Sequence, residues 1–477
     1  MTPDEARARV RERASAELVE RLERLDASRR QRPADDDPPA APDGAGAVDC
    51  DVALVGGGLS ILYAPVLAAR GLRVAVFERH TAAVAHREWN ASRPELERLV
   101  DVGLVAPGEL EGLLVARYRE GFCRWHGGGT YPVRNVLDVA VDAGALLGHA
   151  RRVAEARGVS FHDGHTLVGQ AAGDGRIALR FRTAGGAARE VTARVMVDGR
   201  GASSPAATAD LVCPTVGGVL EGIAAGDGPD AIDPDVGEIL VTTEGVVEGR
   251  QHIWEAFPGR RGEATVYLFY YDRAEAVGEG SLLALYARFF DSLPRYKRGD
   301  ARLLRPTFGY IPGWSRLTPA PRPPSARVVL VGDAAARQSP LTYCGFGATL
   351  RSLGPGAARI AEAAEGRDVG AVVHDTALHA GTGALAHMIA SPSRDPARAG
   401  ELNALLDAAF STLHALGEAS YGALLRDEMD ARTFVRFLYD TSRRHPRVYR
   451  DVFRVLGALG VTRWGASVAR ALWEASP

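Results

Sequence analysis

A glycine-rich stretch followed at a fixed distance by a glutamate carries the clearest chemical signal in the sequence. The run DVALVGGGLSILYAPVLAARGLRVAVFERH is typical of a strand, a glycine turn, a helix and a second strand that ends at Glu78, 22 residues after Gly56. In such a unit the glycines make a tight turn and let the backbone approach a pyrophosphate, while the helix N-terminus attracts the phosphate charge. The glutamate accepts hydrogen bonds from a ribose. The stretch therefore predicts a dinucleotide site with contacts from Gly56, Gly57, Gly58, Leu59, Ser60, Glu78 and Arg79.

Two residues depart from this pattern. Ile61 stands where a third glycine normally permits close packing of helix on strand, and Pro65 falls inside the helix. We expect Ile61 to hold the helix slightly farther from the strand. We expect Pro65 to bend the helix or to remove one amide hydrogen bond.

Two later stretches add candidate contacts to the same nucleotide. ARVMVDGRGASSP ends a strand at an aspartate, and VVLVGDAAARQSPLTYCGFGATL combines a second aspartate with a glycine-rich helix start. An ordinary turn aspartate is an equally good interpretation of the first of the two. The candidate contacts are Asp198, Gly332, Asp333, Pro340, Gly345, Phe346 and Gly347.

The order of these motifs resembles the flavoprotein superfamily that includes aromatic hydroxylases, geranylgeranyl reductases and lycopene cyclases. A closer resemblance, from about Asp51 to Phe434, is to the CruA/CruP type of FAD-dependent lycopene cyclase. The stretches that carry it are REWNASRPELERLV, IWEAFP, VYLFYYD, FGYIPGW, GDAAARQSPLTYCGFGATLR and the helix around Asn403. The resemblance implies FAD as cofactor, with Asp333 on the ribityl chain and the GFG helix start facing the isoalloxazine ring.

The resemblance also implies a chemistry, the redox-neutral cyclisation of lycopene or a similar apolar polyene. A proton adds to a terminal double bond, the resulting cation closes a ring, and a proton leaves. This reaction needs an acid of raised pKa and a negative charge facing the cation, which reduced flavin supplies. Glu255, between Trp254 and Ala256 in a predicted strand, is the candidate acid, although a salt-bridged glutamate at a sheet edge has the same pattern.

Glu88 in REWN is the second candidate acid, and its alternative role is to position Arg87 or Arg93 near the flavin. The competing function is an FAD-dependent reductase or monooxygenase that acts on an apolar substrate. The absence of a second nucleotide-binding glycine motif favours the redox-neutral reaction only slightly. A third alternative is a non-catalytic relative that binds flavin and carotenoid.

The expected fold is α/β, with a discontinuous Rossmann-type FAD-binding domain of residues 48–205 and 305–355. A sheet-rich substrate domain of residues 206–304 and a helical C-terminal region of residues 356–477 complete it. Residues 1–47 are predicted to form a helical extension and a Pro/Asp-rich linker, so that the folded body begins at Val48. The alternation in QHIWEAFP and ATVYLFYY predicts strands of a sheet that is covered on both faces.

Composition limits the remaining classes of function. The chain has 477 residues and a net charge of −2, which suits two or three globular domains and predicts no nucleic-acid partner. Four dispersed cysteines and the isolated HDGH stretch predict a reducing cytoplasm and no metal site. No apolar run is long enough to span a membrane. The C-terminal helices, rich in arginine, predict either a cap on the substrate domain or a peripheral membrane contact.

Overall fold

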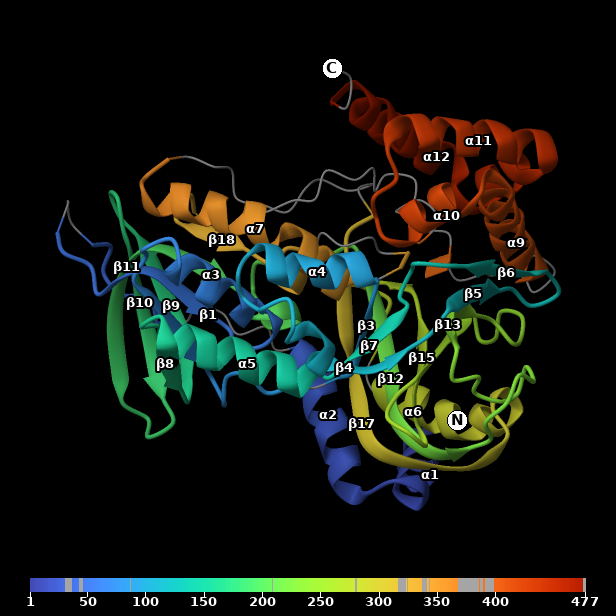
Figure 1. Cartoon of the computed structure of the whole chain (residues 1–477), viewed down its shortest axis with the longest axis horizontal. Helices are drawn as coiled ribbons and strands as arrows, with labels where there is room; N and C mark the ends of the chain where they lie inside the picture. The colour runs from blue at the N-terminus through green and yellow to red at the C-terminus, as the bar shows by residue number, and fades with distance from the viewer. Residues whose placement is uncertain are drawn as a thin grey trace.

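The computed structural model describes the chain except for residues 31–36, 43–45, 86, 208, 279–280, 316–322, 324, 337–340, 343, 368–385, 387–388, 391–398 and 475–477. Within the described residues the strands form three sheets. Figure 1 shows a seven-stranded sheet at one end of the molecule, an eight-stranded sheet at the other and a small sheet between them. The fold is α/β with a helical C-terminal part, as predicted.

Three apolar strands of the first sheet, β1, β2 and β18, are buried along nearly their whole length. β1 pairs in parallel with β2 and β11, β2 pairs with β8, and β11 pairs with β18, which gives the parallel order β8-β2-β1-β11-β18. β10 pairs in antiparallel fashion with the first part of β11, on the edge whose last residues pair with β18, and β9 pairs with β10. The strands are β1 (Cys50–Val55), β2 (Val74–Glu78), β8 (Ser160–Asp163), β9 (His165–Ala172), β10 (Ile177–Thr183), β11 (Ala188–Asp198) and β18 (Val328–Leu330).

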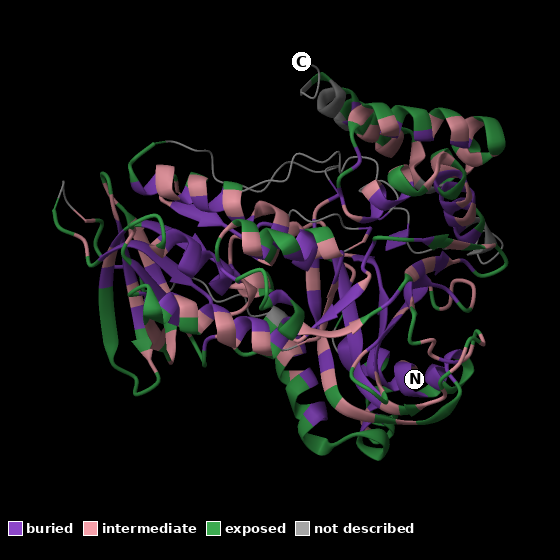
Figure 2. Ribbon diagram, viewed as in Figure 1, coloured by how far each residue is buried: buried purple, intermediate pink, exposed green. Residues whose placement is uncertain are grey.

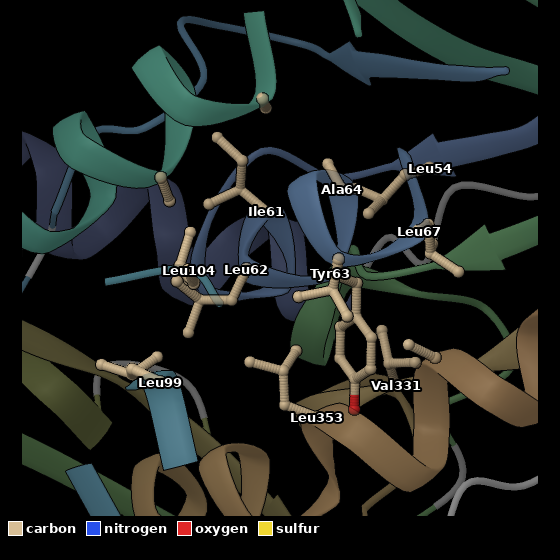
Figure 3. Packing of buried hydrophobic residues seen from close by; sticks show 14 of the residues in the cluster. Leu54, Ile61, Leu62, Tyr63, Ala64, Leu67, Leu99, Leu104, Val331 and Leu353 are labelled. Atoms are coloured by element: carbon tan, nitrogen blue, oxygen red, sulfur yellow. The ribbon is translucent and has the colours of Figure 1, made fainter. Parts of the chain in front are cut away.

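The segment after β1 explains how the chain accommodates Ile61. It begins with the 3-10 helix η1 (Leu59–Leu62) and continues as the short helix α3 (Tyr63–Ala68), which has Pro65 in its first turn. Ile61 is fully buried, and in Figure 3 its side chain points toward α5 (Ala143–Ala156). Tyr63 points toward α7 (Gly345–Ala364), where its hydroxyl lies 3.2 Å from Ser352 Oγ. Side-chain packing thus replaces the glycine contact.

The second sheet has two buried faces, as the alternation in β14 and β15 predicts. Ile253, Phe257, Tyr267, Phe269 and Tyr271 belong to one core cluster, and the intervening Trp254, Ala256, Val266, Leu268 and Tyr270 belong to another. The strands are β5 (Glu120–Arg124), β6 (Thr130–Val133), β12 (Leu211–Ile223), β13 (Val236–Val241), β14 (His252–Pro258), β15 (Glu263–Tyr270), β16 (Asp272–Arg273) and β17 (Gly299–Gly313).

The N-terminal helices form part of this core, which corrects the expectation that the folded body begins at Val48. α1 (Pro3–Arg13), α2 (Ala16–Arg30) and α6 (Ser281–Tyr296) cover one face of the second sheet. Val10, Val19 and Leu22 are fully buried there. In the sequence the apolar stripe of these helices looks too narrow to form a core. The surface that it packs against comes from α6 and β17, far along the chain.

The second sheet also recruits strands from outside residues 206–304. β5 pairs with β13, and β17 pairs with β12 as far as Gly313, so residues 120–133 and 305–313 lie within this sheet. The small third sheet joins β3 (Trp89–Ala91), β4 (Leu114–Arg117) and β7 (Val139–Val141). In the chain α4 (Arg93–Asp101) follows β3 and η2 (Leu110–Leu113) precedes β4. The short helices η3 (Gly201–Ser203) and η4 (Gly332–Ala334) follow β11 and β18 of the first sheet.

C-terminal helices cover the other face of the second sheet. They are α9 (Ala399–Leu416), α10 (Glu418–Leu425), α11 (Ala431–Arg444) and α12 (Val448–Glu474). Asn403 of α9 anchors them, because its amide accepts a hydrogen bond from Thr242 Oγ1 at 2.9 Å and donates one to Gln251 Oε1 at 2.8 Å. Among the helices of the described residues, none is long and apolar enough to cross a membrane.

Candidate functional site

Several of the predicted nucleotide contacts lie at one edge of the first sheet. Val55 lies beside both Phe77 and Asp198, and Asp198 lies beside Leu330. The carboxyl ends of these parallel strands therefore bring together the glycine loop, Glu78, Asp198 and the Gly332 turn. Open α/β sheets bind ligands in the crevice outside this edge.

The three glycines of the loop have different tasks. Gly56 has φ +111°, and a Cβ there would clash with the carbonyl of Gly199. A Cβ on Gly57 would lie 2.6 Å from Ala82 Cβ, whereas a Cβ on Gly58 would meet nothing within 4 Å. Gly56 and Gly57 are thus required by packing, and Gly58 leaves open space into which a pyrophosphate could fit.

Ser60 and Glu78 hold the loop in place. Ser60 Oγ is buried and donates to the carbonyl of Gly56 at 2.9 Å. Glu78 Oε2 accepts from the Gly57 amide at 2.7 Å, and Oε1 accepts from the His80 amide at 2.9 Å. Leu59 is half-buried and Arg79 is exposed at the same edge. The Ser60 hydroxyl and both Glu78 carboxylate oxygens are therefore directed at backbone groups, and the ribose contact of Glu78 stays a prediction.

Substituting Gly56 and Gly58 separates the packing role from the ligand role. Gly56→Ala should lower the free energy of unfolding by about 1–3 kcal/mol, since alanine is strained at this φ. Gly58→Ala should leave it within about 0.5–1 kcal/mol of the parent and weaken FAD binding by roughly ten-fold or more. Denaturant unfolding and a flavin fluorescence titration measure the two effects. Unchanged flavin affinity in Gly58→Ala would show that the ligand does not approach Gly58.

Asp198 and the Gly332 turn lie side by side. Asp198 is fully buried, and its carboxylate binds the Arg200 guanidinium at 2.8 Å and the Ser204 hydroxyl at 2.6 Å. These contacts favour the turn interpretation of Asp198 over a cofactor contact. Gly332, at φ +56°, opens η4, and half-buried Asp333 lies next to Gly201. Pro340 lies outside the described residues.

The start of α7 is packed against the REWNASRPEL segment. Phe346 stacks on Trp89 with ring centroids 4.7 Å apart and planes at 19°. A Cβ on Gly347 would clash with the Glu95 carboxylate, which forms a buried ion pair with Arg351. Gly347 is thus a glycine because Glu95 lies against it, and Gly345 begins the helix.

The Glu95–Arg351 pair was not predicted from the sequence. The spacing of Ser92 and Glu95 is that of a capping box, and in the structure the Ser92 amide donates to Glu95 Oε2 at 2.9 Å. That local signal accounts for a glutamate at this position. It does not reveal a partner 256 residues away.

Arg93 was predicted to approach the cofactor, and the structure gives its side chain other partners. Its guanidinium pairs with Glu111 at 2.5 Å and with Glu97 at 3.4 Å. The Arg93 amide donates to Asp138 Oδ1 at 2.9 Å. This arrangement favours a structural role at the start of α4.

Glu255 lies at the centre of the second candidate group. Asn90 Nδ2, from the EWN stretch, donates to Glu255 Oε1 at 2.8 Å. The neighbouring rings of Tyr118 and Tyr267 are buried, and the Glu255 charge adds to burial in raising the pKa of both phenols. Glu255 is half-buried, and partial removal from water raises its pKa to about 7, against the smaller opposing effect of the Asn90 hydrogen bond.

The Glu255 group adjoins the start of α7. The Cys344 thiol, which precedes α7, has a pKa raised by burial and further by the charges of Asp427, Glu95 and Glu255. Asn90 belongs to the same three-residue strand as Trp89, which stacks on Phe346. The structure therefore brings a carboxyl of raised pKa close to the helix start that was predicted to face a flavin ring.

Glu88 is placed differently. Its carboxylate pairs with Arg305 at 3.3 Å, and Arg305 also pairs with Glu263 at 2.9 Å. Burial raises the pKa of Glu88, and Arg305 opposes that shift. Because a guanidinium stabilises the ionised form, Glu88 is a weaker proton donor than Glu255.

Two other features lie apart from this site. His162 and His165 pack around Phe77, and His162 stacks on that ring at 4.7 Å. Within the described part of the chain, no group of three or more His, Cys, Asp or Glu side chains could hold a metal ion. A surface cavity of about 570 Å³ lies at the opposite, amino ends of β1, β2 and β8, lined in part by Arg73, Arg157 and Arg189.

Comparison with known proteins supports the fold. No protein-family model and no curated sequence matches the chain. A geranylgeranyl bacteriochlorophyll reductase-like protein from Thermoplasma acidophilum matches with a TM-score of 0.55 at 15% identity, over 85% of this chain and 99% of its own. The halogenase PltM in complex with FAD matches with a TM-score of 0.56 at 12% identity, over 89% and 98%.

A flavoprotein/dehydrogenase from Cytophaga hutchinsonii is a third match, with a TM-score of 0.52 at 15% identity, over 87% of this chain and 100% of its own. All three solved structures are matched along nearly their whole length. The chain thus has the fold of the Rossmann-type flavoproteins.

Proposed function

We propose that a chain with this flavoprotein fold binds FAD and acts as a flavin-dependent enzyme on an apolar polyene, cyclising lycopene or a close relative without net redox change. The observation that carries the proposal is the Glu255 carboxyl, whose pKa is raised to about 7 among buried tyrosines beside the start of α7. A carboxylic acid that stays protonated near neutral pH is what protonation of an alkene requires.

The residues at the sheet edge fit FAD. Gly58 leaves space for the pyrophosphate, Glu78 ends β2 where a ribose carboxylate is needed, and Asp333 stands at the neighbouring turn. Bound and reduced, FAD would supply negative charge to face a carbocation. The cofactor contacts of Gly345 and Phe346 remain predictions, and those of Gly347 compete with the packing of Glu95.

The side chains around Glu255 divide the remaining work. Asn90 donates to Oε1, which leaves Oε2 to carry the proton. The buried rings of Tyr118 and Tyr267 exclude water, and aromatic faces stabilise a nearby cation. Phe257, Phe269 and Tyr271, on the same face of β14 and β15, add apolar surface suited to a hydrocarbon.

A redox reaction is the second candidate, and the comparisons favour it at the level of fold, since the matched proteins include a reductase-like protein and a halogenase. In this alternative the chain is an FAD-dependent reductase or monooxygenase acting on an apolar substrate. NAD(P)H consumption that depends on added substrate would distinguish it from the cyclase. Pigment binding without turnover would indicate a non-catalytic flavoprotein.

Expression of the chain in a bacterium that accumulates lycopene tests the proposal. We expect mono- or bicyclic carotenoids by chromatography, and we expect Asp333→Ala to abolish both flavin binding and the new pigments. Unchanged lycopene in cells that contain flavin-loaded protein would exclude lycopene cyclisation and shift the assignment to the redox alternative. Flavin content, measured after purification, separates a failure of cofactor binding from a failure of catalysis.

A further inference from the structure

The last two helices expose apolar side chains that the fold does not use. In the described residues eight large hydrophobic side chains are exposed, and six of them lie on α11 and α12. Phe453 is 55% exposed, Leu459 65% and Trp473 83%. The six residues, called the outer apolar set below, are Val435, Tyr439, Tyr449, Phe453, Leu459 and Trp473.

The same helices already have a separate apolar side that packs inward. Phe434 and Phe437 of α11 are buried in the core cluster beneath them, and Val452, Leu456 and Trp464 of α12 pack against that cluster. Figure 2 shows these helices mainly in the colours of intermediate and exposed residues. The outer apolar set is therefore not required to hold the helices on the protein.

Positive charge accompanies the outer apolar set. Residues 431–474 contain nine arginines and three acidic residues, whereas the whole chain has a net charge of −2. Arg444 and Arg447 are exposed at the junction of the two helices, and the Arg443 guanidinium lies over the Tyr439 ring at 5.8 Å. Exposed aromatic residues interleaved with arginine are typical of helices that lie in a membrane surface.

We propose that the outer side of α11 and α12 docks on the surface of an anionic lipid bilayer. Charge complementarity selects this partner, because a second copy of the chain would bring two arginine-rich surfaces together. The kink at Gly457, which has φ +67°, divides α12 into two helical segments that can each lie along the surface. The proposal does not depend on the enzymatic reaction, and lipid binding can be measured without turnover.

Flotation of the full-length protein with lipid vesicles tests the docking. We expect the chain to float with vesicles of phosphatidylcholine and phosphatidylglycerol in equal amounts, to stay behind with pure phosphatidylcholine, and to be released by 0.5 M NaCl (screening length about 4 Å). The double variant Arg444→Gln/Arg447→Gln should bind about 25-fold more weakly, since each of the two charges near an anionic surface contributes about five-fold. Tyr449→Ser/Phe453→Ser should lose at least ten-fold through reduced apolar burial.

Matched controls come from the other end of the chain. Arg11 and Arg13 are exposed on α1, and Val84 is an exposed apolar residue outside the C-terminal helices. Arg11→Gln/Arg13→Gln and Val84→Ser should float like the parent. Absence of flotation for the parent chain, or equal flotation of normally folded Tyr449→Ser/Phe453→Ser, would overturn the proposal. Self-association that the same substitutions abolish, without vesicle binding, would make the surface an interface between copies.

Discussion

Glu255→Gln is expected to reduce turnover by roughly 10²- to 10⁴-fold, the usual contribution of a positioned general acid, while flavin content stays at the parent level. Glutamine keeps the size of the side chain and still accepts the Asn90 hydrogen bond through its amide oxygen. What it lacks is a proton that it can give to an alkene. The measurement is the initial rate of ring formation by purified, reduced protein at saturating substrate.

Glu88→Gln is the matched control for this variant. Glu88 directly precedes β3, the strand that contains Asn90, and burial raises its pKa too. Its carboxylate, however, forms an ion pair with the Arg305 guanidinium at 3.3 Å. We expect this substitution to cost far less turnover than Glu255→Gln. Full activity of Glu255→Gln together with loss of activity in Glu88→Gln would reverse the assignment of the acid. If both variants kept full activity, neither residue would be the catalytic acid.

The pH dependence follows from the same carboxyl. The protonated form is active, so the rate should be constant at low pH and should fall as the pH rises through about 7, where Glu255 ionises. The Asn90 hydrogen bond lowers that pKa, so Asn90→Ala should move the falling limb to higher pH. The residual rate of Glu255→Gln should not fall as the pH rises through about 7. A limb that stays in place in Glu255→Gln would assign the titration to another group.

Local sequence signals were sufficient for the nucleotide-binding half of the fold. A buried apolar run, a glycine turn and a terminal glutamate predict β1, the loop and β2, because each depends on neighbours in the chain. The two faces of β14 and β15 could be predicted for the same reason, since alternation directly encodes a sheet buried on both sides. Glu255 was found as the one acidic residue of β14.

Features that depend on distant partners could not be predicted in this way. The stripe on α2 looks too thin for a core because the surface that completes it comes from α6 and β17. Ser60 and Asp198 have the residue types of ligand contacts, yet their side chains bind Gly56 and the Arg200–Ser204 turn. Their types are equally suited to closing a loop, and only the fold distinguishes the two uses.

The buried pair of Glu95 and Arg351 leads to the second large effect. Arg351→Met should lower the free energy of unfolding by about 3–5 kcal/mol at neutral pH, because it leaves the buried Glu95 carboxylate without its guanidinium. Burial already raises the pKa of Glu95 and Arg351 opposes that shift, so the variant should take up a proton there and lose less stability at low pH. Denaturant unfolding at two pH values measures both effects.

A double-mutant cycle separates the pair from a general packing defect. Glu95→Gln/Arg351→Met removes both charges while glutamine preserves the capping box of Ser92, so it should recover most of the stability that Arg351→Met loses. Arg98→Met, which breaks the exposed pair with Asp101 on the same helix, should cost less than about 1 kcal/mol. Because Glu95 lies against Gly347 at the start of α7, Arg351→Met should also weaken FAD binding, and the double variant should restore it. Restored stability without restored flavin affinity would show that the pair stabilises α4 and α7 without positioning the cofactor.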